Sequence, residues 1–113
     1  MGEEMIRLKQ GDLFCVRCDD VPWQQSTLTK GVSVKNIAVA GGFEMQLVRM
    51  EPGAQIPVHT HELPEFIYVL EGELQVAGQI LAPGWVSIAA PGSEHSDVSS
   101  INGCTFVLVD RPF

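Results

Sequence analysis

The sequence predicts an all-β fold, either a sandwich or a closed barrel, in a single domain. Its apolar residues occur in many short runs that Gly, Pro and Asn turn signals separate. No segment carries a 3.6-residue apolar stripe of helical length. The 113 residues are enough for one hydrophobic core and too few for two. Because evenly spaced short strands must protect their sheet edges, they favour a sandwich or a barrel.

The predicted strands follow one another along the chain. A strand near 13–16, a polar loop over 22–30 and a strand over 32–39 come first. The runs that follow cover 43–50, 56–61, 65–70, 73–76, 85–89 and 104–109, between the turn signals EPG, ELP, AGQ, APG, APGS and INGC. Only eleven residues separate Gly72 from Gly84, which is enough for a hairpin through Ala77 and Gly78.

The charge is unevenly distributed along the chain. The net charge is −7; residues 1–50 carry six acids and six bases, whereas Glu51 to Asp110 carry eight acids and no Lys or Arg. A surface without cations cannot replace the counterions of a phosphate backbone or bind anionic lipid, so nucleic acid and membrane are not expected as partners. No apolar run reaches 18 residues and the first ten residues do not resemble a secretion signal, so we expect a cytoplasmic protein.

The three cysteines give a weaker signal. Cys15 and Cys18 form a C-x-x-C, which could be half of a zinc site or a redox pair, and Cys104 stands alone. No second C-x-x-C completes a zinc site, and nothing marks Cys15 as the start of a helix. We therefore interpret Cys15 and Cys18 as two thiols in a segment beside an N-terminal strand.

Two histidines lie one residue apart in the stretch GAQIPVHTHELPEFIYVLEG. His61 and Glu65 could share a helix face, but Pro64 and the run FIYVL argue against a helix. On a strand, His59 and His61 point to the same face, and the turn after them lets Glu65 open the next strand beside them. Two imidazoles and one carboxylate leave the opposite side of a metal open, as in non-haem iron sites.

This stretch resembles the first motif of the cupin superfamily, G-x5-H-x-H-x3,4-E-x6-G, at every defined position from Gly53 to Gly72. The second cupin motif, G-x5-P-x-G-x2-H-x3-N, resembles the stretch from Gly84 to Ser99. It differs at two positions, since proline is displaced to Pro91 and Ser99 replaces asparagine. Both positions are turn and packing features in the family.

The resemblance implies a jelly-roll barrel, the cupin double-stranded β-helix, with one divalent transition metal. The metal ligands carried over from the two motifs are His59, His61, Glu65 and His95. Such a set accepts iron, manganese, zinc, nickel or copper. We divide the single domain, 1–113, into N-terminal strands and a loop over 1–40 and a barrel core over 41–113 that contains both motifs.

More loosely, the chain is similar to small single-domain cupins related to zinc-binding anti-sigma factors and to small-ketone dioxygenases. Two classes of function stay open. A metal-dependent enzyme of the oxygenase type, acting on a small molecule, is slightly favoured over a non-catalytic sensor or binding protein. No separate catalytic base is apparent, since Tyr68 falls on the strand face opposite Glu65. Arg49 could receive a substrate carboxylate if it points inward; the alternative is a surface Arg paired with Glu44 or Glu51.

The strand over 65–70 is apolar on both faces. Ile67 and Val69 share the expected metal face, while Phe66, Tyr68 and Leu70 face the other way. The outer face therefore needs a cover. Many cupins pair their sheets, so the resemblance implies a homodimer whose apolar interface includes Phe66 or Tyr68. The alternative is that the N-terminal segment of the same chain buries this face.

Overall fold

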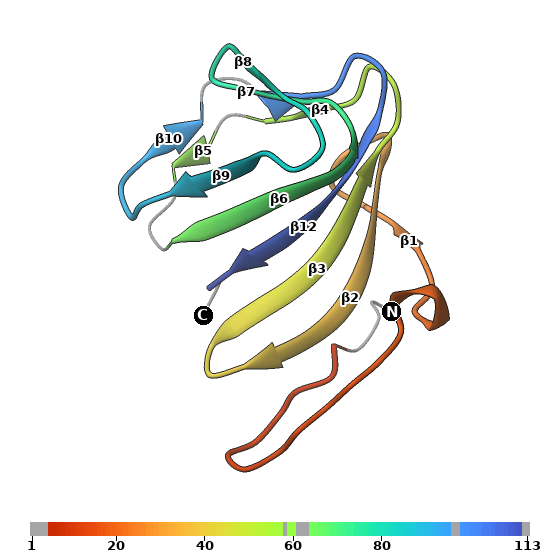
Figure 1. Ribbon diagram of the computed structural model, residues 1–113, viewed down its shortest axis with the longest axis vertical. Helices are drawn as coiled ribbons and strands as arrows, with labels where there is room; N and C mark the ends of the chain where they lie inside the picture. The colour runs from red at the N-terminus through yellow and green to blue at the C-terminus, as the bar shows by residue number, and fades with distance from the viewer. Residues whose placement is uncertain (1–4, 58, 61–63, 96–97, 112–113) are drawn as a thin grey trace.

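The computed structural model describes residues 5–57, 59–60, 64–95 and 98–111, and its strands wrap around one core (Figure 1). The largest sheet has six antiparallel strands in the order β1-β2-β3-β12-β6-β9. These strands are β1 (Gln24–Gln25), β2 (Val32–Ala40), β3 (Phe43–Met50), β12 (Cys104–Asp110), β6 (Glu65–Gly72) and β9 (Val86–Ala89).

Two smaller antiparallel sheets complete the fold. A four-stranded sheet has the order β4-β11-β7-β8, and a two-stranded sheet pairs β10 with β5. Their strands are β4 (Gln55–Ile56), β11 (Val98–Ser99), β7 (Leu74–Val76), β8 (Gln79–Leu81), β10 (Glu94–His95) and β5 (His59–Thr60). The predicted all-β jelly roll is confirmed. The helical element among the described residues is the 3-10 turn η1 (Cys18–Asp20), and no described helix could span a membrane.

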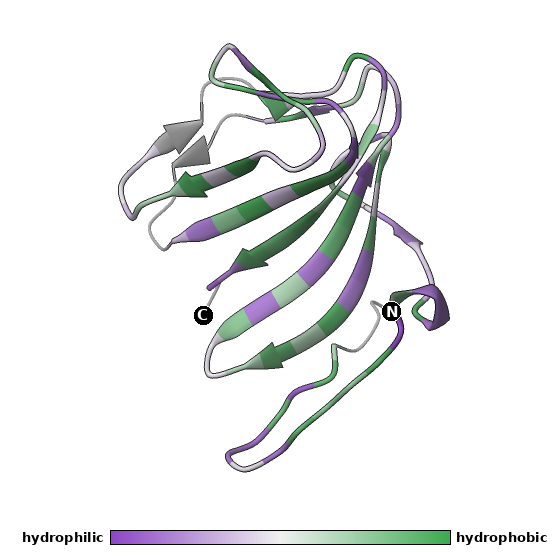
Figure 2. Ribbon diagram, in the orientation of Figure 1, coloured by the Kyte–Doolittle hydropathy of each residue, from purple (hydrophilic) through white to green (hydrophobic). Residues whose placement is uncertain are grey.

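The core lies between the six-stranded and the four-stranded sheets. Val48, Val69 and Phe106 from the first sheet pack with Leu74 and Val98 from the second. Alternation places these residues inside, because successive side chains of a strand point to opposite faces. The predicted parity of β6 is confirmed: its buried residues are Ile67 and Val69, and the residues between them are exposed. Figure 2 shows that β12 is hydrophobic along most of its length, which fits a central strand with apolar residues on both faces.

Local sequence explains most of the strand boundaries. The β7–β8 hairpin turns through Ala77 and Gly78, as predicted; both have positive φ, 50° and 80°, which a tight two-residue hairpin requires. The predicted strand over 56–61 is two strands, β4 and β5, that pair with different partners. Pro57 lies between them, and its missing N–H fits the point where one ladder ends.

The strand predicted near 13–16 is absent. Residues 5–17 instead form an arm that runs past the end of β2 and returns (Figure 1). The arm is tied to the barrel at its start, where Leu8 donates a backbone hydrogen bond to Val39 and Val39 donates one to Ile6. The apolar run at Leu13 to Val16 suggested a strand, but the described sheets offer it no ladder partner. The predicted polar loop over 22–30 contains the two-residue strand β1.

Candidate metal centre and barrel cavity

The histidines of the two sequence motifs meet in the smallest sheet. His59 on β5 and His95 on β10 are direct register partners in an antiparallel ladder. Register partners in such a ladder lie on the same face and are the closest cross-strand neighbours. Residues 36 positions apart in sequence are therefore brought together by the backbone. His61 lies outside the described residues, and for His59 and His95 the structure describes the backbone.

Glu65 begins β6 at the end of the barrel where both histidine strands connect. The chain passes from β5 to β6 through 61–64 and from β9 to β10 through 90–93, and Glu65 is the register partner of Ala89, the last residue of β9. The start of β6 and the end of β9 lie at the same end of this strand pair, on the left in Figure 1. The half-buried Glu65 side chain lines a cavity inside the barrel. The fold thus directs Glu65 and the two histidine strands to one end of the barrel.

The donor set suits a transition metal. Neutral imidazole nitrogens and a carboxylate oxygen are ligands that iron, manganese, zinc, nickel and copper all accept. The described residues contain no group of three or more His, Cys, Asp or Glu side chains that could hold a metal, since three of the four implied ligands have side chains outside the description. The residues placed by the backbone therefore fit the metal that the two motifs imply.

The interior cavity has a volume of about 190 Å³ and is mostly apolar. Both sheets contribute to its wall, with Val48, Ile67 and Phe106 on one side and Ile56 and Val98 on the other. Its polar side chains are Glu65, Gln46 and Thr29. A concave, largely apolar space with a few polar groups is the usual form of a small-molecule site.

A hydrogen-bonded pair of amides, of which Gln46 lines this cavity, was missed in the sequence. Gln46 on β3 lines the cavity, and its Nε2 donates a hydrogen bond of 2.6 Å to Oδ1 of its cross-strand partner Asn36 on β2. The sequence could have indicated this residue, because strand alternation puts Gln46 on the same face of β3 as the buried Val48 and Met50. A polar residue on an otherwise apolar inner face is more informative than an exposed one.

Three carboxyl side chains form a row across the inner face at the end of the barrel where β6 begins. Glu44 on β3, Asp110 on β12 and Glu65 on β6 are successive cross-strand partners. Burial raises the pKa of Glu44, and the neighbouring Asp110 carboxyl raises it further through charge repulsion and a hydrogen bond. The positive charge of Arg7 lowers the pKa of Glu44 and offsets part of this rise. The row makes this end of the barrel a region of negative potential that favours a cation.

Arg49 lies on the outer face of β3 and is not among the residues that line the cavity. Its guanidinium carbon is 4.2 Å from the centre of the Trp23 ring, and Lys35 Nζ is 4.9 Å from the same centre. The buried Lys35 also donates a hydrogen bond of 2.8 Å to the Cys18 carbonyl. These contacts hold the segment around Trp23 on the outer face. The contact found for Arg49 is Trp23, and neither Glu44 nor Glu51 forms an ion pair with it among the described residues.

The cysteines occupy three different environments. Cys15 is exposed on the arm, Cys18 is half-buried at the start of η1, and Cys104 is buried at the start of β12. All three are free thiols. Burial raises the pKa of Cys104, partly offset by hydrogen bonds with Ser100 and the Met50 backbone. Cys15 lies on the extended arm and Cys18 follows it, and the strand that the sequence predicted beside them is absent.

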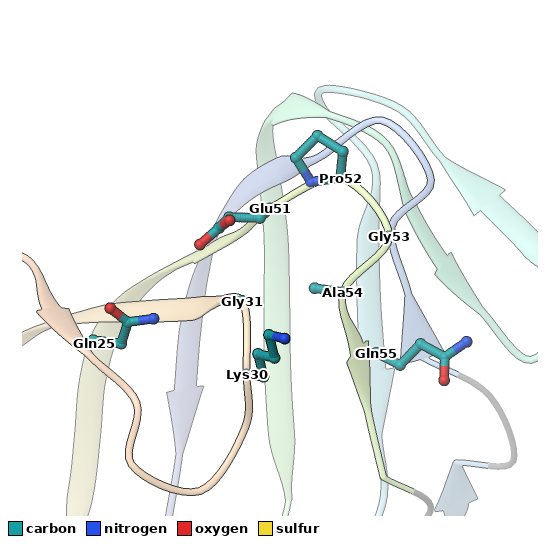
Figure 3. A pocket seen from close by; sticks show the side chains of 8 residues that line it. All are labelled: Gln25, Lys30, Gly31, Glu51, Pro52, Gly53, Ala54 and Gln55. Atoms are coloured by element: carbon teal, nitrogen blue, oxygen red, sulfur yellow. The ribbon is translucent and has the colours of Figure 1, made fainter.

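A second depression, of about 530 Å³, lies on the outside of the barrel (Figure 3). Gln25, Lys30 and Gly31 form one wall, and the segment from Glu51 to Gln55 forms the other. The two walls approach closely at Gly31, where an added Cβ would be 3.2 Å from the Cβ of Ala54. Glu65, the implied ligand whose side chain the structure describes, does not line this groove.

Comparison with known proteins identifies a family for this chain and solved structures that share its fold. A family model described as the ChrR cupin-like domain matches residues 12–113. No match was found among curated proteins. The fold is shared with the polyketide cyclase RemF from Streptomyces resistomycificus, with TM-score 0.77, 22% identity, and coverage of 90% of this chain and 83% of that chain.

Two further solved structures share the fold. A proposed acetylacetone dioxygenase from Methylibium petroleiphilum has TM-score 0.81 and 16% identity, with coverage of 95% of this chain and 81% of that chain. The Rhodobacter sphaeroides anti-sigma ChrR complex with SigE has TM-score 0.71 and 24% identity, with 82% of this chain and 51% of that chain covered. At these identities the similarity concerns the fold.

Proposed function

The chain belongs to the ChrR cupin-like domain family, and from this premise we propose that it is a metal-dependent enzyme of the oxygenase type that acts on a small organic molecule. The proposal rests on one observation above all. The register of β5 and β10 brings His59 opposite His95, at the end of the barrel where Glu65 lines the cavity. A metal at this position would have access to a molecule in the cavity.

His59, His61, Glu65 and His95 would hold one divalent transition metal. Such a metal would supply Lewis-acid or redox chemistry toward dioxygen and a chelating molecule. Glu65 contributes a negative charge that offsets part of the charge of the cation. The buried side chains of Ile67, Val69 and Phe106 keep bulk water from the inner side of the site.

Metal analysis tests the site. The purified protein should contain about one metal ion per chain, and His59→Ala, His95→Ala and Glu65→Gln should each lower this content. Glu71→Gln is a matched control, because Glu71 lies on the same strand and is exposed. Metal affinity should also fall below about pH 6, since protonated imidazole does not bind metal. Metal-free protein that takes up no ion on reconstitution would contradict the assignment.

A non-catalytic metal or small-ligand sensor is the second candidate. The description of the matching family model favours it, because that model is named after ChrR, which occurs as an anti-sigma in a similar structure. Dioxygen uptake separates the two candidates. The anaerobic ferrous protein should consume dioxygen when small dicarbonyl or hydroxyketone compounds are added, and Glu65→Ala should abolish uptake. Ligand-induced thermal stabilisation without uptake or product would favour the sensor.

The proposal includes a homodimer in the cytoplasm. Three free thiols suit a reducing compartment. The outer face of β6 supports self-association, since Phe66 and Tyr68 are 41% and 48% exposed in the single chain.

A further inference from the structure

The wall of the interior cavity limits the size of any molecule that binds there. Its volume is about 190 Å³. An engineered apolar cavity of about 150 Å³ is large enough for benzene. A compact molecule with a single six-membered ring and one small substituent therefore matches the space, whereas two fused rings exceed it.

The charge of the wall limits the class of molecule further. Glu65 is the one ionisable side chain among the described residues that line the cavity. Lys35 and Arg49 contact Trp23 on the outer face, and Lys30 lines the outer groove. A carboxylate in the part of the cavity away from Glu65 would lose its hydration among apolar side chains, and none of the described wall residues is basic. An uncharged molecule avoids this cost.

Gln46 offers one directed polar contact inside the cavity. Its Nε2 is already engaged with Asn36 Oδ1 at 2.6 Å, and this bond fixes the plane of the amide. The other N–H and the Oε1 remain as hydrogen-bonding groups toward the cavity. Gln46 is the register partner of Leu108, and Leu108 is the partner of Ile67, so Gln46 lies one cross-strand row deeper in the barrel than Glu65. Its amide therefore borders the cavity one inner row away from Glu65.

We propose that this cavity selects a small, uncharged, mainly apolar molecule with a carbonyl or hydroxyl group, and that Gln46 is the residue that orients it. The proposal rests on the proposed function, because it assigns the substrate class to the same site. The end of the molecule nearer Glu65 would face the metal, while the apolar body contacts Val48, Ile67 and Phe106. Asn36 is a positioning residue that acts through the Gln46 amide.

A probe series on the 113-residue chain tests the selection. ¹H–¹⁵N NMR titrations would compare cyclohexanone, cyclohexanecarboxylate and 2-decalone, on protein as purified and after chelator treatment, with metal content measured in each sample. Cyclohexanone should shift the amide resonances of residues 46–48, 67 and 106. The carboxylate and the two-ring ketone should each bind at least tenfold more weakly. Equal or tighter binding of the carboxylate, or shifts confined to 30–31 and 51–55, would overturn the proposal.

Variants test the role of the amide separately. Gln46→Met keeps the size of the side chain and should weaken cyclohexanone binding about fivefold to tenfold, a loss typical of one hydrogen bond. Asn36→Ala should weaken it less, and Lys30→Ala in the outer groove should leave it unchanged. Unchanged binding by a folded Gln46→Met protein would refute the role of Gln46. Ketone binding by protein that takes up no metal would refute the proposed metal function and support the cavity assignment, so the two failures are distinguishable.

Discussion

Glu44 and Asp110 are direct cross-strand partners on β3 and β12, and their carboxyl groups are hydrogen-bonded to each other. Two carboxyl groups can share such a bond when one of them holds a proton. Burial and the Asp110 carboxyl raise the pKa of Glu44, so this carboxyl resists ionisation in the folded protein. The pair therefore makes the free energy of unfolding depend on pH.

Glu44→Gln should stabilise the protein at neutral pH. The pKa of Glu44 is raised in the folded protein above its ordinary value of 4.5. The stabilisation that Glu44 gives the fold is therefore fully present below pH 4.5 and is lost as the pH rises through the raised pKa. The glutamine does not ionise, so the difference in melting temperature between variant and wild type should be small near pH 4 and should grow toward pH 8. Thermal unfolding at several pH values measures it, with Glu71→Gln as a control for loss of one charge. A difference that is independent of pH would contradict this account.

Gly72→Ala should destabilise the fold far more than Gly53→Ala. Both glycines have positive φ, 72° and 84°. A Cβ on Gly72 would lie 2.8 Å from the Cα of Cys104 and closer still to the Gly103 carbonyl, whereas a Cβ on Gly53 has nothing within 4 Å. Gly53→Ala should therefore cost about 1–2 kcal/mol from backbone conformation alone. Gly72→Ala requires β6 and β12 to separate, and we expect a loss of more than about 3 kcal/mol in urea unfolding.

The three cysteines should react with a thiol reagent at very different rates. Cys15 is exposed and should react first, while Cys104 is buried with a raised pKa and should react only when the protein unfolds. Absorbance of the thiolate released by an Ellman-type disulfide at pH 7.5 measures the rates. Cys15→Ser should remove the fast phase of the reaction. Unfolding in urea should make the slowest thiol, Cys104, accessible to the reagent. Modification of Cys104 in the folded protein at the rate of Cys15 would contradict the structure.

Period-two alternation and turn residues predicted the barrel because they are local properties. The run over 43–50 matches β3, and the parity of Ile67 and Val69 on β6 follows from alternation alone. Pairing partners are not local, which explains the two errors. The run over 56–61 changes partner at Pro57, and the apolar run at 13–16 has no neighbouring strand among those described.

The sequence predicted some parts of the candidate site and not others, for the same reason. The spacing of the two motifs assigned the ligands, and the register of His59 with His95 supports a common location. The amide pair of Gln46 and Asn36 depends on the alignment of β2 with β3, which the sequence does not specify. The direction of Arg49 could have been predicted from parity, because it alternates with the inner residues Val48 and Met50.

Phe66→Glu should convert a dimer to a monomer. The arm crosses the β2 end of the six-stranded sheet, so the described part of the N-terminal segment, from residue 5 onward, leaves the outer face of β6 and β9 exposed. Phe66, Tyr68 and Ile88 are 41%, 48% and 67% exposed there. Contiguous apolar surface of this kind marks an interaction site. A second copy of the chain can cover it through the same surface on both subunits, which closes a two-fold dimer.

Light scattering after size exclusion at micromolar concentration measures the mass. We expect the wild type at about twice 12.3 kDa and Phe66→Glu near 12.3 kDa, because a buried unpaired carboxylate at an apolar interface costs several kcal/mol. Ile80→Glu is the matched control, since Ile80 is an exposed apolar residue, at 55%, on β8 of the other sheet and should not affect the dimer. A wild-type mass near 12.3 kDa would refute the dimer. Dissociation by Ile80→Glu but not by Phe66→Glu would move the interface to the four-stranded sheet.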